Sequence, residues 1–431
     1  MKMNKTLLSA AVAVGLLSTS TATQAAGFQL AEYSATGLGR AYAGEAAIAD
    51  NAGSQWRNPA LLTYLEGTQV SVGAIYVDPN IDIEGTSSHT STPSNSSDFA
   101  HSAVIPNFYV SHKYNDKFAL GFAAGTNYGM ETDLGTDFGG ANHGNEASVT
   151  TMELNLNAAY QVLENVSIGG GIRYVMAEGS FGAIASPHSP LAGTTLKYME
   201  GDDTAWGWQV GTAWQINENN RLGFTYKSEV DLTLEGHAKG VGFDAVAGLI
   251  GSPVKSQYNG SMQLALPATA ELASLHQLTD KVAIHASINW TNWSSFKELV
   301  ADIPEFGAAS SQDIKQENWE DNYRFALGTT YQMTPKLALR SGIAYDTSAV
   351  SEEHRTATIP ETDRTWLSIG AGYQWSEQLT LDAGFTYILA KDAKMYESDP
   401  GLGGADMFGG SFKGEVTGSI WLVGIQANYR F

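Results

Sequence analysis

Hydrophobic and polar residues alternate along many short stretches of the chain. Residues 206–216 show the pattern most clearly, because tryptophan and aliphatic residues occupy one face of an extended strand and Gly, Gln and Ala occupy the other. Residues 152–161, 222–235 and 367–375 follow the same period of two, which places successive side chains on opposite faces of a strand. The second face is too polar for the dry core of a β-sandwich, so the pattern predicts strands with one face toward lipid and the other toward a wet lumen.

Two stretches are each interpreted as a single strand. In residues 222–235 the parity places Leu232 on the lipid face and Lys227 on the lumen face. Residues 256–278 contain Pro267. We interpret this proline as a bend within one strand, because proline removes a ladder hydrogen bond and bacterial barrels have an even number of strands.

The connections between the predicted strands alternate in length. Short turns such as Asn115-Asp116 and Thr334-Pro335 alternate with seven long polar segments. The long segments lie at about 79–103, 131–147, 180–202, 236–255, 295–318, 347–363 and 390–413. Short periplasmic turns and long external loops are typical of bacterial barrels, and seven long loops imply fourteen strands. The sequence therefore predicts an all-β fold, a 14-stranded antiparallel transmembrane β-barrel.

The beginning of the chain carries an export signal. Lys2 and Lys5 precede an apolar run at residues 7–17, and small residues follow up to Ala25. The run is too short to span a membrane as a helix, so the order predicts a cleavable signal peptide over residues 1–25. An uncleaved anchor is the alternative interpretation.

The end of the chain carries a second signal. Residues 420–431 alternate strictly, with aromatic residues on the apolar face, and the chain ends on Phe431. A lipid-facing barrel strand requires this alternation, and the terminal Phe resembles the signature that the barrel-assembly machinery recognises. Together with the signal peptide, this strand predicts a location in the outer membrane of a Gram-negative bacterium.

Composition excludes several classes of function. The mean hydropathy is −0.17, as expected for barrel strands, which place only alternate residues in lipid. The formal net charge of −21 argues against nucleic acid, which binds basic surfaces. The nine histidines show no metal-ligand spacing, and no Ser or Asp is paired with a His as in a catalytic site. We therefore expect no cofactor, no metal and no enzymatic activity.

Residues 26–66 do not follow the strand pattern. The segment is rich in small residues, has helical periodicity, and precedes the first clear strand at 69–77. We interpret it as a partly helical hatch that plugs the lumen; a periplasmic tail is the alternative. The expected domains are a signal peptide at 1–25, the hatch at 26–66 and a barrel at 67–431.

Several short motifs, spread over nearly the whole mature chain, together resemble those of a known protein family. They are Gly27-Phe28-Gln29-Leu30, Gly37-Leu38-Gly39-Arg40-Ala41, Asn58-Pro59-Ala60, and shorter matches at 76–79, 127–129, 219–221, 228–230 and 323–331. Together they resemble the FadL family of outer-membrane long-chain fatty acid transporters. The resemblance implies a fourteen-stranded barrel closed by an N-terminal hatch. It also implies a substrate that lands in an apolar groove between outer loops, enters a buried pocket near the mature N-terminus, and leaves sideways through a gap at a kinked strand.

The resemblance assigns substrate-binding roles to a few residues. Phe28 matches an aromatic residue beside the buried pocket, and Lys315 matches the pocket lysine, a cation suited to a carboxylate headgroup. The family's second basic pocket residue should fall near Phe181, where no Arg or Lys stands. Arg173, on the lumen face of the preceding strand, is the candidate substitute.

Gating roles follow from the same resemblance. Gly129 matches the strand kink, where a breach in strand pairing would open the wall; a glycine that ends an ordinary strand is the alternative. Asn58, Pro59 and Ala60 match the hatch motif that faces the kink. A polar residue before a proline is common in any loop, so this motif alone is a weak signal.

The predicted external loop at 236–255 contains a helical pattern of apolar residues. Phe243 and Leu249 belong to this pattern. They are the candidates for the landing groove, and a small core within the loop is the alternative.

The expected function is passive, hatch-gated import of long-chain fatty acids by a monomer. Its partners would be outer-membrane lipid, lipopolysaccharide and, during biogenesis, the barrel-assembly machinery, with no nucleic acid. The missing cation near Phe181 keeps open an importer of uncharged or aromatic hydrophobic compounds. An outer-membrane lipase would need a reactive Ser–His pair, and a general porin would need an open lumen. A TonB-coupled receptor is excluded, since such barrels have about 22 strands.

Overall fold

The computed structural model describes residues 27–90, 93–401 and 403–431. The predicted signal peptide, residues 1–25, lies outside the described residues, as does Ala26. Within the described ranges, no helix has the length and apolar character needed to cross a membrane.

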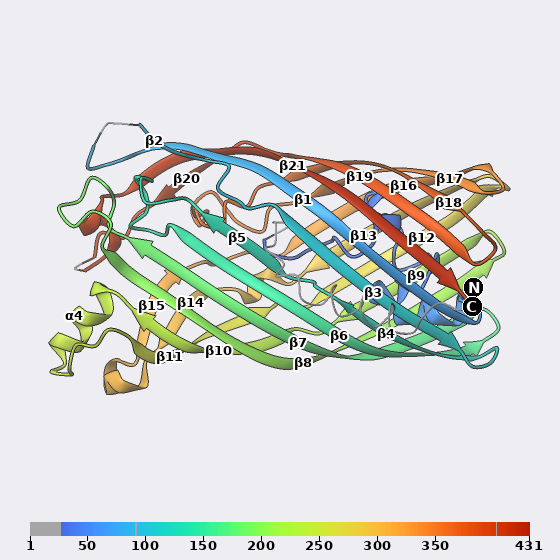
Figure 1. The fold of residues 1–431 in the computed structure, drawn as a ribbon, viewed down its shortest axis with the longest axis horizontal. Coiled ribbons are helices and arrows are strands. Elements are labelled where there is room, and N and C mark those ends of the chain that lie inside the picture. The colour runs from blue at the N-terminus through green and yellow to red at the C-terminus, as the bar shows by residue number, and fades with distance from the viewer. Residues whose placement is uncertain (1–26, 91–92, 402) are drawn as a thin grey trace.

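The strands form one antiparallel sheet that closes on itself (Figure 1). The sheet has 21 strand segments, and β1 pairs with β21 along its whole length to close the barrel. Five ladder strands are each interrupted into two segments, and two segments are short loop strands, so the described residues form a closed 14-stranded barrel. The predicted fold class and strand number are confirmed.

The fourteen ladder strands are β1 (Thr68–Ser87), β3 (Ala103–Lys113), β4 (Phe118–Gly125) with β5 (Gly129–Asp133), β6 (Glu146–Leu163), β7 (Val166–Ile184), β8 (Thr195–Asn217), β9 (Asn220–Lys227) with β10 (Val230–Lys239), β11 (Tyr258–Leu266) with β12 (Thr269–Thr279), β13 (Val282–Thr291) with β14 (Glu298–Asp302), β15 (Ser311–Gln316) with β16 (Asn322–Thr334), β17 (Leu337–Asp346), β18 (Arg364–Gln374), β19 (Leu379–Ala390) and β21 (Phe412–Arg430). The loop strands are β2 (Pro93–Ser97) and β20 (Ala393–Glu397). The described helices are α2 (Ala35–Leu38), α3 (Ser54–Arg57), α4 (Val241–Leu249) and the 3₁₀ helices η1 (Pro59–Tyr64), η2 (Trp293–Ser295), η3 (Pro304–Ala309) and η4 (Ala405–Phe408).

Along each strand, exposed and buried side chains alternate as the sequence pattern predicts. The apolar side chains are the exposed ones and the polar side chains are buried, which is the opposite of a soluble protein. Leu156 is 66% exposed, whereas its neighbours Asn155 and Asn157 are buried. Trp206 is likewise 68% exposed on β8. Apolar side chains point outward and polar side chains point into the lumen, as a barrel in lipid requires.

Neighbouring interruptions divide β9 from β10 and β11 from β12. β11 ends just before Pro267, β12 pairs with β9, and β10 pairs with β11, so the bend predicted at the proline is shared by two adjacent strands. The predicted parity of residues 222–235 is wrong beyond this point. Leu232 and Leu234 are only 2% and 1% exposed and point inward, because the irregularity at Ser228 shifts the side-chain phase by one residue.

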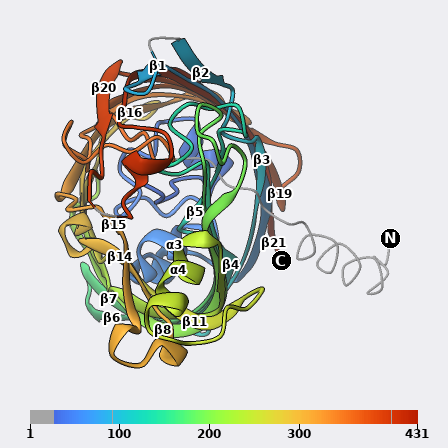
Figure 2. The same ribbon diagram turned by 90° about the vertical axis from the view of Figure 1, so that its left-hand side faces the viewer.

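Residues 27–66 lie inside the ring of strands (Figure 2), and nearly all of them are buried. They carry α2, α3 and η1 and pack against the inner wall. A Cβ atom at Gly223 would lie 1.8 Å from the carbonyl oxygen of Ala46, and one at Gly342 would lie 2.2 Å from that of Arg40. The wall therefore has glycine where the backbone of the N-terminal segment approaches it most closely.

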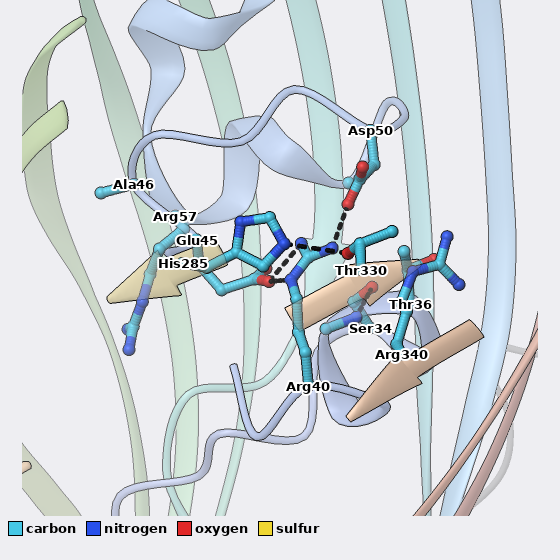
Figure 3. A network of polar contacts seen from close by, with 12 residues as sticks. Ser34, Thr36, Arg40, Glu45, Ala46, Asp50, Arg57, His285, Thr330 and Arg340 are labelled. Carbon is cyan, nitrogen blue, oxygen red and sulfur yellow. Dashed lines mark hydrogen bonds and ion pairs between the residues drawn. The ribbon is translucent and has the colours of Figure 1, made fainter. Parts of the chain in front are cut away.

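Ion pairs buried in the lumen also hold the N-terminal segment in shape (Figure 3). The Arg40 guanidinium donates to Glu45 at 2.6 Å and lies 2.6 Å from an Asp50 carboxylate oxygen. Arg57 reaches the wall and pairs with Glu271 of β12 at 2.7 Å. Charge-assisted bonds of this kind are needed because an unpaired buried charge is costly.

Candidate functional site

The barrel wall has a gap in its hydrogen-bond ladder between β3 and the third strand. β3 and β4 are paired only as far as Phe108↔Ala124. The chain leaves the ladder at residues 126–128 and resumes as β5, which pairs with β6. Above the gap, the isolated bridge Ala100↔Thr132 joins the two sides again. Gly129, the predicted kink residue, is the first residue of the strand after this break.

The start of the N-terminal segment lies directly against the break. The Leu30 backbone N–H donates to the Asn127 carbonyl at 2.7 Å, and the Gly129 N–H donates to the Phe28 carbonyl at 2.8 Å. Gln29 and Tyr128 form an isolated antiparallel bridge. Residues 28–30, named here the inner strip, thus act as a short strand that satisfies backbone groups of the broken strand from the lumen side.

Phe28 sits in a cage of aromatic side chains. Its ring centroid is 4.6 Å from that of Trp293, 5.8 Å from Phe296, 6.0 Å from Trp319 and 6.1 Å from Tyr128. Phe28 itself is 1% exposed. Edge-to-face and tilted rings at these distances attract one another beyond their burial, so the cage anchors the inner strip.

A small apolar cavity of about 30 Å³ adjoins the cage. Phe28, Met130, Phe181 and Leu264 contribute to its lining, and one carboxyl group, Glu317, also reaches it. Burial raises the pKa of Glu317 to about 7, although Lys315 and the hydrogen bond from Trp319 work in the opposite direction. The cavity therefore combines an apolar lining with one weakly acidic group.

A larger cavity of about 550 Å³ opens among the long loops above the cage. Lys315 lines it, with its Nζ 2.7 Å from Glu397 Oε1 and 3.2 Å from the His143 carbonyl oxygen. Phe181 lines both this outer cavity and the small apolar one, with the Lys315 Nζ 5.8 Å from its ring centroid. The aromatic ring at position 181 therefore stands between the two cavities. Other cations on the outer cavity are Lys197 and Arg355.

Arg173 does not line the cavity with Lys315. It is 2% exposed, and its guanidinium donates to both carboxylate oxygens of Glu153 at 2.9 and 2.8 Å and to the Ser228 carbonyl at 2.9 Å. Glu153 also accepts from Asn127 Nδ2 at 2.7 Å. Arg173 therefore lies beside the strand break, to which it is linked through Glu153 and Asn127. Its positive charge is paired with the Glu153 carboxylate.

The Asn58-Pro59-Ala60 motif lies against β7 and β8 rather than at the break. Asn58 Nδ2 donates to the carbonyls of Ala46 at 2.7 Å and Thr212 at 3.0 Å. A Cβ atom at Gly169 would meet Ala60 N at 2.4 Å. The motif was predicted to face the kink, but in the structure it does not. The inner strip, near the other end of the N-terminal segment, lies against the kink instead.

The two loop residues proposed for a groove have opposite environments. Phe243 is 2% exposed and belongs to the apolar cluster that includes Phe181. Leu249, at the end of α4, is 88% exposed. The helical pattern of the loop is present, and Phe243 packs into a large apolar cluster that also contains Phe28 rather than into a core confined to the loop.

Sequence reasoning missed Trp293, Trp319 and Glu317 as neighbours of Phe28. The two tryptophans flank the predicted long segment 295–318, and large aromatics at both ends of a polar loop were the signal available. Within the described residues, no group of three or more His, Cys, Asp or Glu side chains is placed to hold a metal ion.

Comparison with known proteins identifies the family. The profile described as "Outer membrane protein transport protein (OMPP1/FadL/TodX)" matches residues 16–431. The chain belongs to the OMPP1/FadL/TodX family. It is an outer-membrane β-barrel of a transport family, as the sequence predicted.

Relatives of this family match the chain over almost its full length. A "Long-chain fatty acid transport protein" of Escherichia coli O6:H1 is 36% identical, covering 98% of this chain and 97% of its own. A "47 kDa outer membrane protein" of Pasteurella multocida is 37% identical, covering 100% and 99%. Among solved structures, a Pseudomonas aeruginosa FadL homologue superposes with a TM-score of 0.83 at 22% identity, over 94% of this chain and 100% of its own. The Ralstonia pickettii toluene transporter TbuX gives 0.65 at 18%, over 94% and 100%. These two structures share the fold.

Proposed function

We propose that this family member imports long-chain fatty acids passively, by lateral exit through the strand break. The observation that carries the proposal is the inner strip: residues 28–30 are hydrogen-bonded to the break, and the first of them, Phe28, also lines the apolar cavity. A movement of one short segment would therefore connect the cavity to the wall. The names of close relatives, such as the E. coli long-chain fatty acid transport protein, support the cargo.

The proposed path runs from the outer cavity inward. A fatty acid enters among the long loops, where its carboxylate meets Lys315 and displaces Glu397 from the ammonium group. Its acyl chain passes Phe181 and widens the apolar cavity beside Phe28, whose about 30 Å³ is too small for the chain until the lining residues move apart. Sideways exit into the bilayer keeps the methylene groups out of water, which favours this route by about 0.8 kcal/mol per methylene over a water-filled pore.

In this proposal residues 26–66 act as the hatch. Asn58, Pro59 and Ala60 fasten the hatch to β7 and β8, while Gly129 is the first residue of the strand that re-forms after the break. Phe243 packs into the apolar cluster that contains Phe181, and Leu249 offers an exposed apolar contact for arriving cargo. The proposal includes removal of residues 1–25 on export, assembly by the barrel-assembly machinery and work as a monomer surrounded by lipid and lipopolysaccharide.

A second cargo class is favoured by one specific observation. Lys315 is already neutralised by Glu397 at 2.7 Å, and Arg173 is neutralised by Glu153. Uncharged or aromatic compounds would use the apolar cavity without disturbing either pair. The likeness to a toluene transporter at 18% identity concerns the fold alone.

An enzymatic role has weak support. One Ser–His contact exists in a loop, where Ser351 Oγ lies 3.0 Å from His354 Nδ1. The two residues are three apart in a single turn, which is a common local hydrogen bond. Labelling of Ser351 by a fluorophosphonate probe would support a lipase; an unlabelled barrel is the expected result.

The proposed function is tested by uptake of radiolabelled oleate and toluene in cells that lack their own transporters, with and without this protein. Restored oleate uptake supports the fatty-acid proposal. Toluene uptake without oleate uptake, from a correctly assembled barrel, would overturn it in favour of uncharged cargo.

A further inference from the structure

The buried ammonium group of Lys227 has few partners. Lys227 is the last residue of β9, points into the lumen and is 3% exposed. Its Nζ lies 3.3 Å from Asn127 Oδ1 and 4.7 Å from the ring centroid of Trp56. It forms no ion pair with any residue that the structure describes. An ammonium group carries three donors, so a buried one with a single long hydrogen bond is under-satisfied.

The two carboxylates closest in the network are engaged by other groups. Glu153 accepts two hydrogen bonds from Arg173 and a third from Asn127. Glu271 accepts from Arg57 at 2.7 Å and from the Ala46 N–H at 3.0 Å. Most other buried lumen cations, such as Arg57 and Arg173, have a carboxylate partner in direct contact. Lys227 is left with unused hydrogen-bond donors that an added carboxylate could accept from.

A cavity of about 30 Å³ adjoins Lys227. Its lining includes the neutral hydrogen-bonding side chains of Thr225, Gln29 and Asn322. The two carboxylates that also line it, Glu271 and Asp346, are each paired with an arginine of the lining, Arg57 and Arg324. A cavity of this size holds roughly two water-sized groups, which is the space that a carboxylate headgroup needs. The cavity is too small for an acyl chain.

The inner strip separates this polar cavity from the apolar one. Phe28 lines the apolar cavity, and the next residues, Gln29 and Leu30, line the polar cavity. Lys227 also touches Asn127, whose carbonyl accepts the bond from Leu30. The cation is therefore next to the segment that would have to move for the wall to open.

We infer that Lys227 is a second carboxylate-binding site, where the headgroup of a fatty acid binds after leaving Lys315 and before lateral exit. The inference rests on the proposed function and adds an inner site to it. A carboxylate bound there would form an ion pair with Lys227 and compete with the Asn127 side-chain oxygen for its ammonium group. Asn127 is also the residue whose backbone carbonyl holds Leu30 of the inner strip against the break, so a shift of Asn127 would disturb that bond. Cargo would thereby loosen its own gate.

The test compares charge variants at position 227 in otherwise intact protein. Lys227→Gln keeps a hydrogen-bond donor toward Asn127 and removes the charge, Lys227→Met removes both, and Lys227→Arg keeps the charge. Lys117→Met, in an exposed turn, is the matched control for loss of a lysine. Heat-modified migration on gels reports whether each barrel is folded, and the Gln variant serves if the Met variant fails to fold.

Two readouts separate the inner site from the outer one. For Lys227→Gln we expect oleate uptake to fall about tenfold, the loss of one charge-assisted contact, while equilibrium binding of oleate to purified protein persists at Lys315. Lys227→Arg should retain most uptake. Wild-type uptake by the Gln variant would overturn the inference, as would a parallel loss of binding and uptake. Absence of oleate uptake by the wild-type protein would instead overturn the proposed function, and the inference with it.

Discussion

The backbone N–H of Leu30 donates a 2.7 Å hydrogen bond to the carbonyl oxygen of Asn127. Asn127 lies in the three-residue break between β4 and β5, so a wall strand that has lost its neighbour is completed by the N-terminal segment from inside the barrel. Each such bond contributes only about 0.5–1.5 kcal/mol net. The seal is therefore specific in position yet weak enough to open.

In the proposed function, Lys315 and Glu397 set the affinity of the outer cavity for carboxylates. We predict that Lys315→Met weakens oleate binding about tenfold or more, because a charge-assisted hydrogen bond is worth about 1.5–3 kcal/mol. Glu397→Gln should strengthen binding, since it removes the carboxylate that occupies the ammonium group at 2.7 Å. Titration of purified protein by calorimetry measures both changes. Equal oleate affinity in the two variants would contradict a headgroup role for Lys315.

Asn58 fastens the N-terminal segment to the wall. Its amide donates to the carbonyls of Ala46 and Thr212, and its oxygen accepts from the Ala60 N–H. Asn58→Ala leaves these buried groups unpaired and should destabilise the segment by about 1–3 kcal/mol.

The expected consequence of Asn58→Ala is a barrel that still assembles but shows more frequent ion-conducting openings in planar bilayers. Asn115→Ala, in an exposed turn, is the control and should leave conductance unchanged. Wild-type conductance in folded Asn58→Ala protein would show that the motif does not hold the segment.

Glu317 makes stability depend on pH in a defined direction. Burial raises its pKa from the ordinary 4.5 to about 7, so between these values the folded state holds a proton that the unfolded state has lost. The stabilisation that protonated Glu317 gives the folded state is fully present below pH 4.5 and is lost as pH rises through about 7. The loss in the free energy of unfolding is up to about 3 kcal/mol. Denaturant unfolding between pH 4.5 and 8 should show this decline in wild-type protein and a smaller one in Glu317→Gln. Identical slopes would refute the shifted titration.

The barrel itself was predictable because lipid and lumen impose opposite demands on alternate residues. The exposed Leu156 between the buried Asn155 and Asn157 shows this pattern. It can be read from one strand alone, without knowing which strands pair with it. The same logic failed at Leu232, because a one-residue irregularity at Ser228 reverses the faces and leaves no mark in the alternation.

The candidate site was only partly predictable because ion pairing depends on strand register. Arg173 and Glu153 belong to neighbouring strands, and their bidentate contact follows from the pairing of Asn155 with Arg173. The sequence showed a lumen cation but not its partner. The shortage of hydrogen-bond acceptors around Lys227 could not be predicted from the sequence for the same reason, because three strands and the N-terminal segment meet around its side chain.

The most direct test of the account is a reversible lock between the inner strip and the break. Gln29 and Tyr128 form an antiparallel bridge, a geometry with Cα atoms about 4.5–5.5 Å apart that suits a disulfide, and the chain contains no cysteine. The matched control is a disulfide between Gln69→Cys and Arg430→Cys, which are paired across the closed β1–β21 seam.

Oleate uptake would be measured in cells carrying Gln29→Cys with Tyr128→Cys, before and after reduction. The account predicts that the oxidised protein loses most uptake, that reduction restores it, and that the seam control is indifferent to oxidation. Undiminished uptake by fully oxidised protein would contradict lateral exit through the break.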